Sequence, residues 1–171
     1  MRGTVRTISY SALAAAMSVC ALVPTFTRPS RAAAAAPCKA TPRQTKSFPQ
    51  LGPIPWLKAT PGSAGITAHL FYASSMKGKA AQMHTHGQNP GGSTTKILWL
   101  IKNKAATNSI TINGKNLTGT GKTHQVFQRA GGGTEGYDDF PSIVDVPTSG
   151  CWQFTVSSGK VRAAVTIPVV G

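Results

Sequence analysis

The sequence predicts an all-β sandwich. Apolar and polar residues alternate in short stretches across residues 65–171, and turn residues separate these stretches about every ten positions. After residue 35, no stretch offers the long apolar stripe of period 3.6 that an amphipathic helix needs. A domain of ~135 residues also buries enough surface to fold without a metal or a partner. A small closed barrel is the alternative arrangement of the same pattern.

About seven or eight strands are expected. The first covers residues 66–72, which are apolar at every second position. Residues 96–101 (KILWLI) are apolar on both faces, which is typical of a central strand. Residues 109–112 lead into Asn113-Gly114, a pair that favours a tight hairpin turn because both residues tolerate positive φ, and the return strand then begins at Leu117.

The carboxyl-terminal third supplies the remaining strands. They are expected at residues 123–128, 142–146, 150–156 and 161–169, with Ser158-Gly159 turning the last hairpin. Within residues 150–156, Trp152 and Phe154 share one face and Cys151 lies on the other. We therefore expect Trp152 in the core and Cys151 on the outside of its sheet.

Residues 36–64 are predicted to form a Pro-rich extended arm ahead of the sandwich. Six prolines in this range forbid a regular helix and disfavour central strands. The apolar residues of the arm are expected to lie against the domain; they are Phe48, Leu51, Ile54, Trp56 and Leu57.

Residues 1–35 have the pattern of a secretory signal peptide. Arg2 and Arg6 precede an apolar run at residues 8–23, which is shorter than the ~20 residues of a membrane span, and small residues at 32–36 offer cleavage sites. The chain is therefore expected to be exported, with no transmembrane segment after processing, and to be a monomer. A lipoprotein is the alternative, although Val19 before Cys20 and Pro37 before Cys38 do not suit acylation.

The cysteines point to one disulfide. Cleavage removes Cys20, which leaves Cys38 and Cys151 as the only pair in an oxidising compartment. This bond would hold the arm across the outside of the sheet. The alternative is two free thiols.

The charge is strongly unbalanced, with 18 basic residues against 4 acidic ones. Removal of residues 1–35 takes away four arginines and leaves 14 basic residues. With the 4 acidic residues subtracted, the formal charge of the processed chain is +10. All the acids lie at Glu135, Asp138, Asp139 and Asp145, too close together for glycosidase chemistry with two separate carboxylates. The basic residues are spread along the chain. They suggest anionic cell-wall polymers or lipid headgroups as partners, with no specific nucleic acid, or else solubility alone.

One segment has residues that suit a metal. In Met83-His84-Thr85-His86, the imidazoles of His84 and His86 point to one side if the backbone is extended, and Met83 adds a soft ligand for copper. His69 or His124 would be the third imidazole for zinc or copper. The alternative is a polar surface loop with no cofactor.

The loop at residues 73–94 that contains this segment is long, which makes it a candidate interaction surface with Lys77 and Lys79. The acidic segment 135–139 is expected to be a solvated turn, or else a weak site for a cation or a lysine partner.

Enzyme motifs fail in detail. Residues 119–123 (GTGKT) echo a phosphate-binding loop, but Asn116 stands where the first glycine is required and a strand pattern follows. No Gly-x-Ser-x-Gly sequence occurs. Asn116-Leu117-Thr118 matches a glycosylation sequon, which matters only in a host that modifies such sites.

The terminal run PSIVDVPTSGCWQFTVSSGKVRAAVTIPVV resembles the last three strands of an immunoglobulin-like domain. Together with PWLKA and TTKILWLIKN, it resembles a group of uncharacterised small bacterial secreted proteins and lipoproteins over residues 53–169. The resemblance implies an immunoglobulin-like antiparallel β-sandwich at residues 65–171 and an extracytoplasmic location. Antibody domains place their cysteines on two facing strands, whereas Cys38 lies in the arm, so their disulfide is not carried over.

Together these observations predict a secreted, non-enzymatic binding or structural module of the bacterial cell envelope, with an unknown ligand. Extracytoplasmic copper or zinc binding through Met83, His84 and His86 is the first alternative. A small secreted hydrolase is the second.

Overall fold

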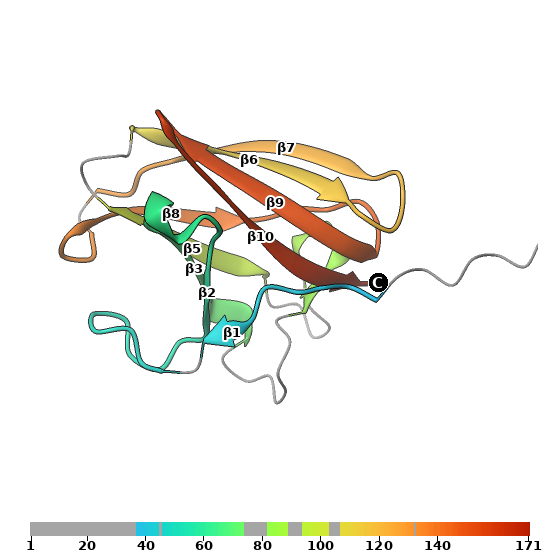
Figure 1. The fold of residues 1–171 in the computed structure, drawn as a ribbon, viewed down its shortest axis with the longest axis horizontal. Coiled ribbons are helices and arrows are strands. Elements are labelled where there is room, and N and C mark those ends of the chain that lie inside the picture. Colours follow the sequence, from blue (N-terminus) through green and yellow to red (C-terminus); the bar gives the residue numbers. More distant parts are fainter. Residues whose placement is uncertain (1–36, 45, 74–81, 89–93, 103–106, 132) are drawn as a thin grey trace, which may run out of the picture. The chain divides into compact units, whose positions relative to one another are not determined.

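The computed structural model describes residues 37–171 except 45, 74–81, 89–93, 103–106 and 132 (Figure 1). The predicted signal peptide, Lys77 and Lys79 lie outside the described residues. Within them, ten strands form two sheets of five strands each, which confirms the all-β sandwich. In this part of the chain no helix is long and apolar enough to cross a membrane.

The first sheet is antiparallel and has the strand order β1-β2-β3-β5-β8. Its strands are β1 (Arg43–Gln44), β2 (Trp56–Lys58), β3 (Ile66–Leu70), β5 (Lys96–Lys102) and β8 (Tyr137–Ile143). Short 3₁₀ turns, Gly62–Ala64 and Phe71–Ala73, flank β3.

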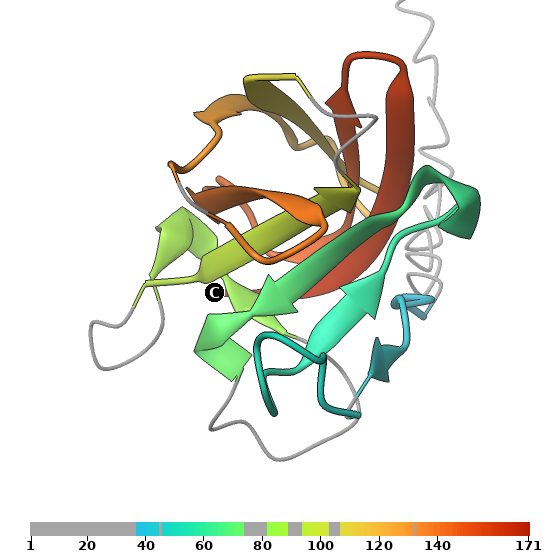
Figure 2. The same ribbon diagram turned by 90° about the vertical axis from the view of Figure 1, so that its left-hand side faces the viewer.

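The second sheet has the order β4-β10-β9-β6-β7 and lies above the first in Figure 1. Its strands are β4 (Met83–His84), β10 (Val161–Val170), β9 (Gly150–Ser158), β6 (Ser109–Asn116) and β7 (Lys122–Gln128). All neighbours are antiparallel except β4, which runs parallel to β10. Figure 2 shows the two layers, with strands of the first sheet crossing in front of the β9–β10 hairpin.

The main core fills the space between the sheets. Trp99 and Phe140 from the first sheet and Trp152 and Phe154 from the second are fully buried there. Burying an apolar side chain of this kind stabilises the fold by roughly 1.5–3 kcal/mol. Trp152 therefore lies in the core, as its place in the alternation predicts.

Strand β5 is buried on both faces, as its continuous apolar run predicts. Ile97, Trp99 and Ile101 face the main core, whereas Leu98 and Leu100 face outward and are also buried. They lie in a second cluster, which we call the aromatic cluster; its members are Phe48, Leu98 and Leu100, with Leu51, Trp56, Phe71 and Tyr137 packed against them.

The predicted turn at Asn113-Gly114 is wrong. Strand β6 runs through both residues, with Asn113 opposite His124 and Gly114 opposite Thr123, and the chain turns at residues 117–121 instead. A Cβ atom at Gly114 would lie 3.1 Å from Cε1 of Phe154 and 2.5 Å from Cγ2 of Thr123. This glycine therefore makes room for the core rather than for a turn.

Strand β8 begins earlier than residue 142, the predicted start. Tyr137 pairs with Lys102 on β5, so residues 137–139 belong to the strand and not to a solvated turn. Both acids at this position have partners: Asp138 accepts a hydrogen bond from Nη1 of Arg129 at 3.1 Å, and Asp139 accepts hydrogen bonds from the backbone and hydroxyl of Thr134. Arg129 therefore forms an ion pair with one of these carboxylates, and hydrogen bonds from Thr134 satisfy the other.

The Pro-rich segment adds strands β1 and β2 to the first sheet and also covers one side of β10 in the second. Thr60 exchanges two backbone hydrogen bonds with Ala164, at 2.9 and 2.8 Å. Thr41 donates to the carbonyl of Thr166 and accepts, through its hydroxyl, from the backbone N–H of that residue. The segment thereby joins the two sheets along this side.

Candidate functional site

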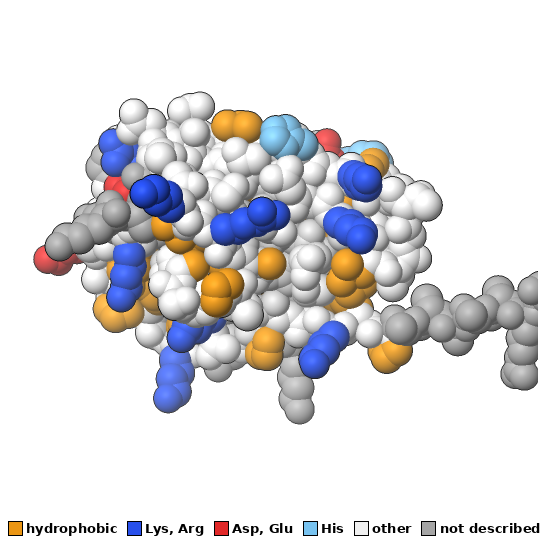
Figure 3. All heavy atoms as spheres, turned by 45° about the horizontal axis from the view of Figure 1, so that its top comes forward, with side chains coloured by type: hydrophobic (Ala, Val, Ile, Leu, Met, Phe, Trp, Pro, Cys, Tyr) orange, Lys and Arg blue, Asp and Glu red, His pale blue; other side chains and the backbone are white. Residues whose placement is uncertain are grey.

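The outward side of β10, β9, β6 and β7 is polar and positively charged, and we call it the basic face. It arises from alternation: Ile110 and Ile112 of β6 point into the core, so Asn113 and Lys115 point outward. The charged or titratable residues of the basic face are Lys115, Lys122, His124 and Arg162, all exposed. Figure 3 shows basic side chains spread over this face and acidic ones towards its margins.

Two lysines stand directly opposite each other on the basic face. Lys115 of β6 pairs with Lys122 of β7, and on its other side with the neutral Gln153 of β9. Directly opposite residues have Cβ atoms about 4.5–5.5 Å apart, at which distance like charges destabilise the sheet. Two positive charges held this close together make the pair a site of high positive potential.

No carboxylate of the described chain lies on the basic face to offset this charge. The four acids of the sequence are in or beside β8: Asp138 and Asp139 are within the strand, Glu135 precedes it and Asp145 follows it. The separation leaves the lysine pair without an ionic partner within the sheet, so it is available to an anion from solution.

A groove of about 500 Å³ runs over the lysine pair. Its polar lining includes Asn113, Lys115, Lys122, His124 and Gln153. Nδ1 of His124 lies 2.7 Å from Oδ1 of Asn113, and because a carbonyl oxygen only accepts, Nδ1 carries the proton. The ammonium groups of Lys115 and Lys122 and the amides of Asn113 and Gln153 make the groove chemically suited to phosphate or carboxylate oxygens.

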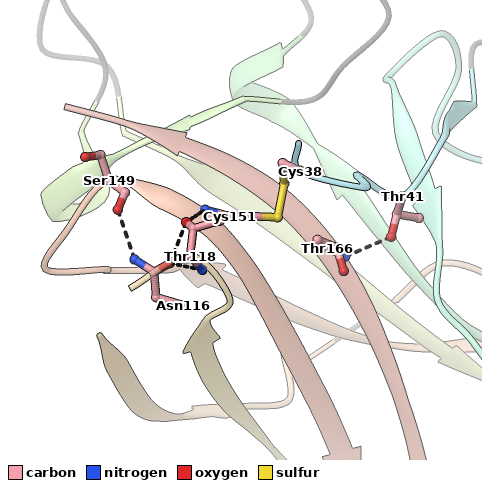
Figure 4. The surroundings of a disulfide bond; sticks show 7 residues. All are labelled: Cys38, Thr41, Asn116, Thr118, Ser149, Cys151 and Thr166. Carbon is pink, nitrogen blue, oxygen red and sulfur yellow. Dashed lines mark hydrogen bonds between the residues drawn. A yellow bond between two sulfur atoms is a disulfide. The ribbon is translucent and has the colours of Figure 1, made fainter. Parts of the chain in front are cut away.

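The predicted disulfide between Cys38 and Cys151 is present, and it lies on the outer side of β9 (Figure 4). Its two Cα atoms are 5.3 Å apart, although the residues are separated by 113 positions in the chain. Cys151 is only 4% exposed, because the segment of Cys38 and Thr41 covers it. Beside the bond, the backbone N–H of Cys151 donates to the hydroxyl of Thr118.

The sequon asparagine is buried beside this disulfide. The Asn116 side chain donates to the carbonyl of Ser149 at 2.9 Å and accepts from the backbone and hydroxyl of Thr118, each at 3.0 Å. Asn116 therefore holds the turn at residues 117–121 and has no free amide group to carry a glycan.

The predicted metal segment is only partly extended. Met83 is fully buried in the main core, and His84 on the other side of β4 lies 3.4 Å from the carbonyl of Gly171 through Nδ1. The chain then enters the 3₁₀ turn Thr85–Gly87, where His86 has a φ of 59° and its Nδ1 lies 3.9 Å from Asp145. The structure therefore separates the thioether of Met83 from the two imidazoles.

The proposed third imidazoles lie elsewhere. His69 is buried on β3 beneath the rings of Phe48 and Trp56, and His124 lies on the basic face. Among the described residues, no group of three or more His, Cys, Asp or Glu side chains is arranged to hold a metal. Copper or zinc binding and hydrolysis remain predictions.

Sequence reasoning missed the lysine pair because the basic residues look dispersed along the chain. The pairing depends on where the hairpin turns. With the chain turning at residues 117–121, the observed register of β6 and β7 brings Lys115 opposite Lys122. The turn was misplaced because Gly114 is typical of a hairpin turn. In the structure a glycine is needed there because the ring of Phe154 approaches closely.

No family model, curated protein or solved structure matches this chain.

Proposed function

We propose that the protein is a non-enzymatic binding module of the bacterial cell envelope and that its basic face holds anionic wall polymers. One observation carries the proposal: Lys115 and Lys122 are directly paired on a face with no carboxylate in the described chain. The pairing raises the energy of the free protein, and a polyanion that supplies negative charge at the pair relieves it.

Two features support a location outside the cytoplasm. The disulfide between Cys38 and Cys151 requires an oxidising compartment to form and persist. The pattern of residues 1–35, with basic residues before a short apolar run, is that of an export signal. An exported protein with a positive face meets the anionic polymers of the envelope before other polyanions.

The polar side chains that lie beside the lysines of the basic face favour a polymer over a lipid surface as the ligand. The basic face presents the side chains of Thr111, Gln153 and Thr155 in rows beside the lysines. Hydroxyl and amide groups of this kind form hydrogen bonds with the oxygen atoms of a hydrated chain. A lipid surface would instead reward apolar side chains that insert between headgroups.

Binding of soluble poly(glycerol phosphate) tests the proposal. The double variant Lys115→Gln/Lys122→Gln is expected to bind this polymer at least tenfold more weakly than the unchanged protein, measured by calorimetry at low salt. Binding should also weaken as salt is added, because released counterions and screened charges drive it.

A matched control separates the basic face from net charge alone. The variant Lys46→Gln/Lys96→Gln removes the same two charges from exposed positions in or beside the first sheet, and its affinity is expected to change less than twofold. An equal loss in both double variants would contradict the proposal. So would tighter binding to phosphatidylglycerol vesicles than to the polymer at equal phosphate concentration.

A further inference from the structure

A second cleft lies on the opposite side of the molecule from the basic face, next to the aromatic cluster. Its volume is about 350 Å³, within the range of pockets that hold small ligands. Its walls include three aromatic rings, two lysines and one threonine: Phe48, Trp56, Tyr137, Lys58, Lys102 and Thr67. Among the residues that the structure describes, no acidic side chain lines it.

The aromatic walls are held in place before any ligand arrives. The ring of Phe48 packs edge to face against Trp56 and Tyr137, with centroids 5.5 Å apart in each pair. The indole N–H of Trp56 donates to the carbonyl of Lys46 at 3.0 Å. Phe48 is buried, but Trp56 and Tyr137 keep part of their surface in solvent. Rings fixed in this way bind a ligand without the entropy loss of ordering them.

The two lysines reach the cleft over glycines. A Cβ atom on Gly62 would lie 2.8 Å from Cε of Lys58, and one on Gly65 would lie 3.1 Å from Cγ of Lys102. The aliphatic stems therefore lie along the 3₁₀ turn at Gly62–Ala64 and its following residue, while the exposed ammonium groups stay in solvent. Within the described residues neither lysine forms an ion pair. The cleft thus combines apolar ring faces with two uncompensated positive charges.

The hydroxyl of Thr67 is a hydrogen-bond donor in the cleft, because the neighbouring His69 donates to its oxygen and leaves its proton free. Nε2 of His69 is 3.0 Å from the hydroxyl oxygen of Thr67, and Nδ1 is buried with no partner among the described atoms. Burial lowers the pKa of His69 to about 4, so the ring is neutral near pH 7. A buried N–H without an acceptor is rarer than an unfilled lone pair, which assigns the proton to Nε2. The Thr67 hydroxyl then accepts from His69 and keeps its own proton for a ligand.

We propose that this cleft binds one sugar residue that carries an anionic group, separately from the polymer on the basic face. The C–H face of the sugar ring packs on the exposed aromatic surface of Trp56 and Tyr137, because C–H groups carry the partial positive charge that an aromatic face attracts. The carboxylate or phosphate of the sugar lies between Lys58 and Lys102. A ring oxygen or hydroxyl of the sugar accepts a hydrogen bond from the Thr67 hydroxyl.

The tryptophans of the chain provide the assay. Trp99 and Trp152 are fully buried, so quenching of fluorescence by acrylamide reports mainly on Trp56. Methyl β-glucuronide and glucose 6-phosphate are the two anionic probes, and methyl β-glucoside is the neutral one. At least one anionic probe is expected to protect Trp56 with saturation and to bind at least tenfold more tightly than the neutral sugar. The better of the two anionic probes shows whether the cleft prefers carboxylate or phosphate.

Variants separate this site from the basic face. Lys58→Gln, at an exposed position that leaves the core intact, is expected to weaken the anionic probe at least fivefold and to leave the neutral sugar unchanged. Lys115→Gln/Lys122→Gln should leave the sugar affinity unchanged, so failure of one site is distinguishable from failure of the other. Equal binding of neutral and anionic sugars would overturn the proposal, as would protection of Trp56 by none of them.

Discussion

The outward sides of the two sheets carry different surfaces. Over the second sheet, the basic face is open to solvent and its outward residues are mostly polar or charged, with Val126 exposed among them. Over the first sheet, Leu98 and Leu100 are buried under Phe48 and the aromatic cluster. A strand with one apolar face leaves a surface for charged ligands, whereas a strand with two apolar faces requires a covering segment.

The disulfide links these two regions, and removing it should have the largest effect. It ties the segment that continues to Phe48 to the outer side of β9, and it closes a loop of 113 residues. The variant Cys38→Ser/Cys151→Ser is expected to lose about 4–5 kcal/mol of unfolding free energy, because the unfolded chain gains loop entropy. Urea unfolding of the oxidised protein and the variant measures the difference. A loss below ~1 kcal/mol would mean that other contacts hold the segment as firmly.

Opening the covered side should have the next largest effect. Phe48→Ala removes a buried ring from the aromatic cluster, and we expect a loss of about 3–5 kcal/mol. The matched control is Val126→Ala on the basic face, where a 51% exposed side chain should change stability by less than ~0.5 kcal/mol. Equal effects of the two substitutions in chemical denaturation would contradict the distinction between covered and open sides.

Acid should weaken the covered side through His69. Burial lowers the pKa of this imidazole to about 4, against an ordinary value of 6.5. The unfolded chain then binds a proton below pH 6.5 that the folded chain refuses, so stability falls as the pH drops from 6.5 to 4. The loss is about 3 kcal/mol at pH 4.

The variant His69→Phe keeps an aromatic ring under Phe48 but does not titrate. The difference in unfolding free energy between this variant and the unchanged protein should therefore shift by about 3 kcal/mol between pH 7.5 and pH 4. Parallel pH profiles for the two proteins would rule out a buried neutral His69.

The smallest effect should have the opposite sign. Lys115→Gln relieves the repulsion from Lys122 on the basic face and is expected to stabilise the protein by about 0.2–1 kcal/mol at low salt. In 0.5 M NaCl the gain should shrink, because the shorter Debye length screens exposed charges. Thermal unfolding at both salt concentrations gives the comparison, and a destabilised variant would show that Lys115 has a structural partner.

The sequence pattern was sufficient to predict the range of a strand where the strand is long and its two faces either differ in polarity or are both apolar. Strands β5, β7, β9 and β10 follow the predicted ranges closely. The short strands β1, β2 and β4 were not predicted, because two or three residues show no period and prolines surround the first two. At Asn113-Gly114 the turn signal competed with packing against Phe154, and packing prevailed.

The two candidate sites were harder to predict because each depends on residues brought together by register. The spacing of the basic residues along the chain hides the pairing of Lys115 with Lys122. In the cleft, Trp56 and Tyr137 come from strands that are not neighbours in the first sheet. The shared side of His84 and His86 was predicted for an extended backbone, and the turn at Thr85–Gly87 interrupts it, so metal binding with Met83 stays a prediction.

The cover along β10 also bears on how this protein behaves at high concentration. β10 is ten residues long, and an uncovered side would present a row of backbone donors and acceptors to a strand from another molecule. On that side Thr60 forms hydrogen bonds with Ala164, and Thr41 with Thr166. Strand β4 pairs with the end of β10, and Pro168 has no N–H to donate. The disulfide anchors this cover, so reduction should expose a template for intermolecular strand addition. Aggregation after reduction would then begin at β10, before the core itself unfolds.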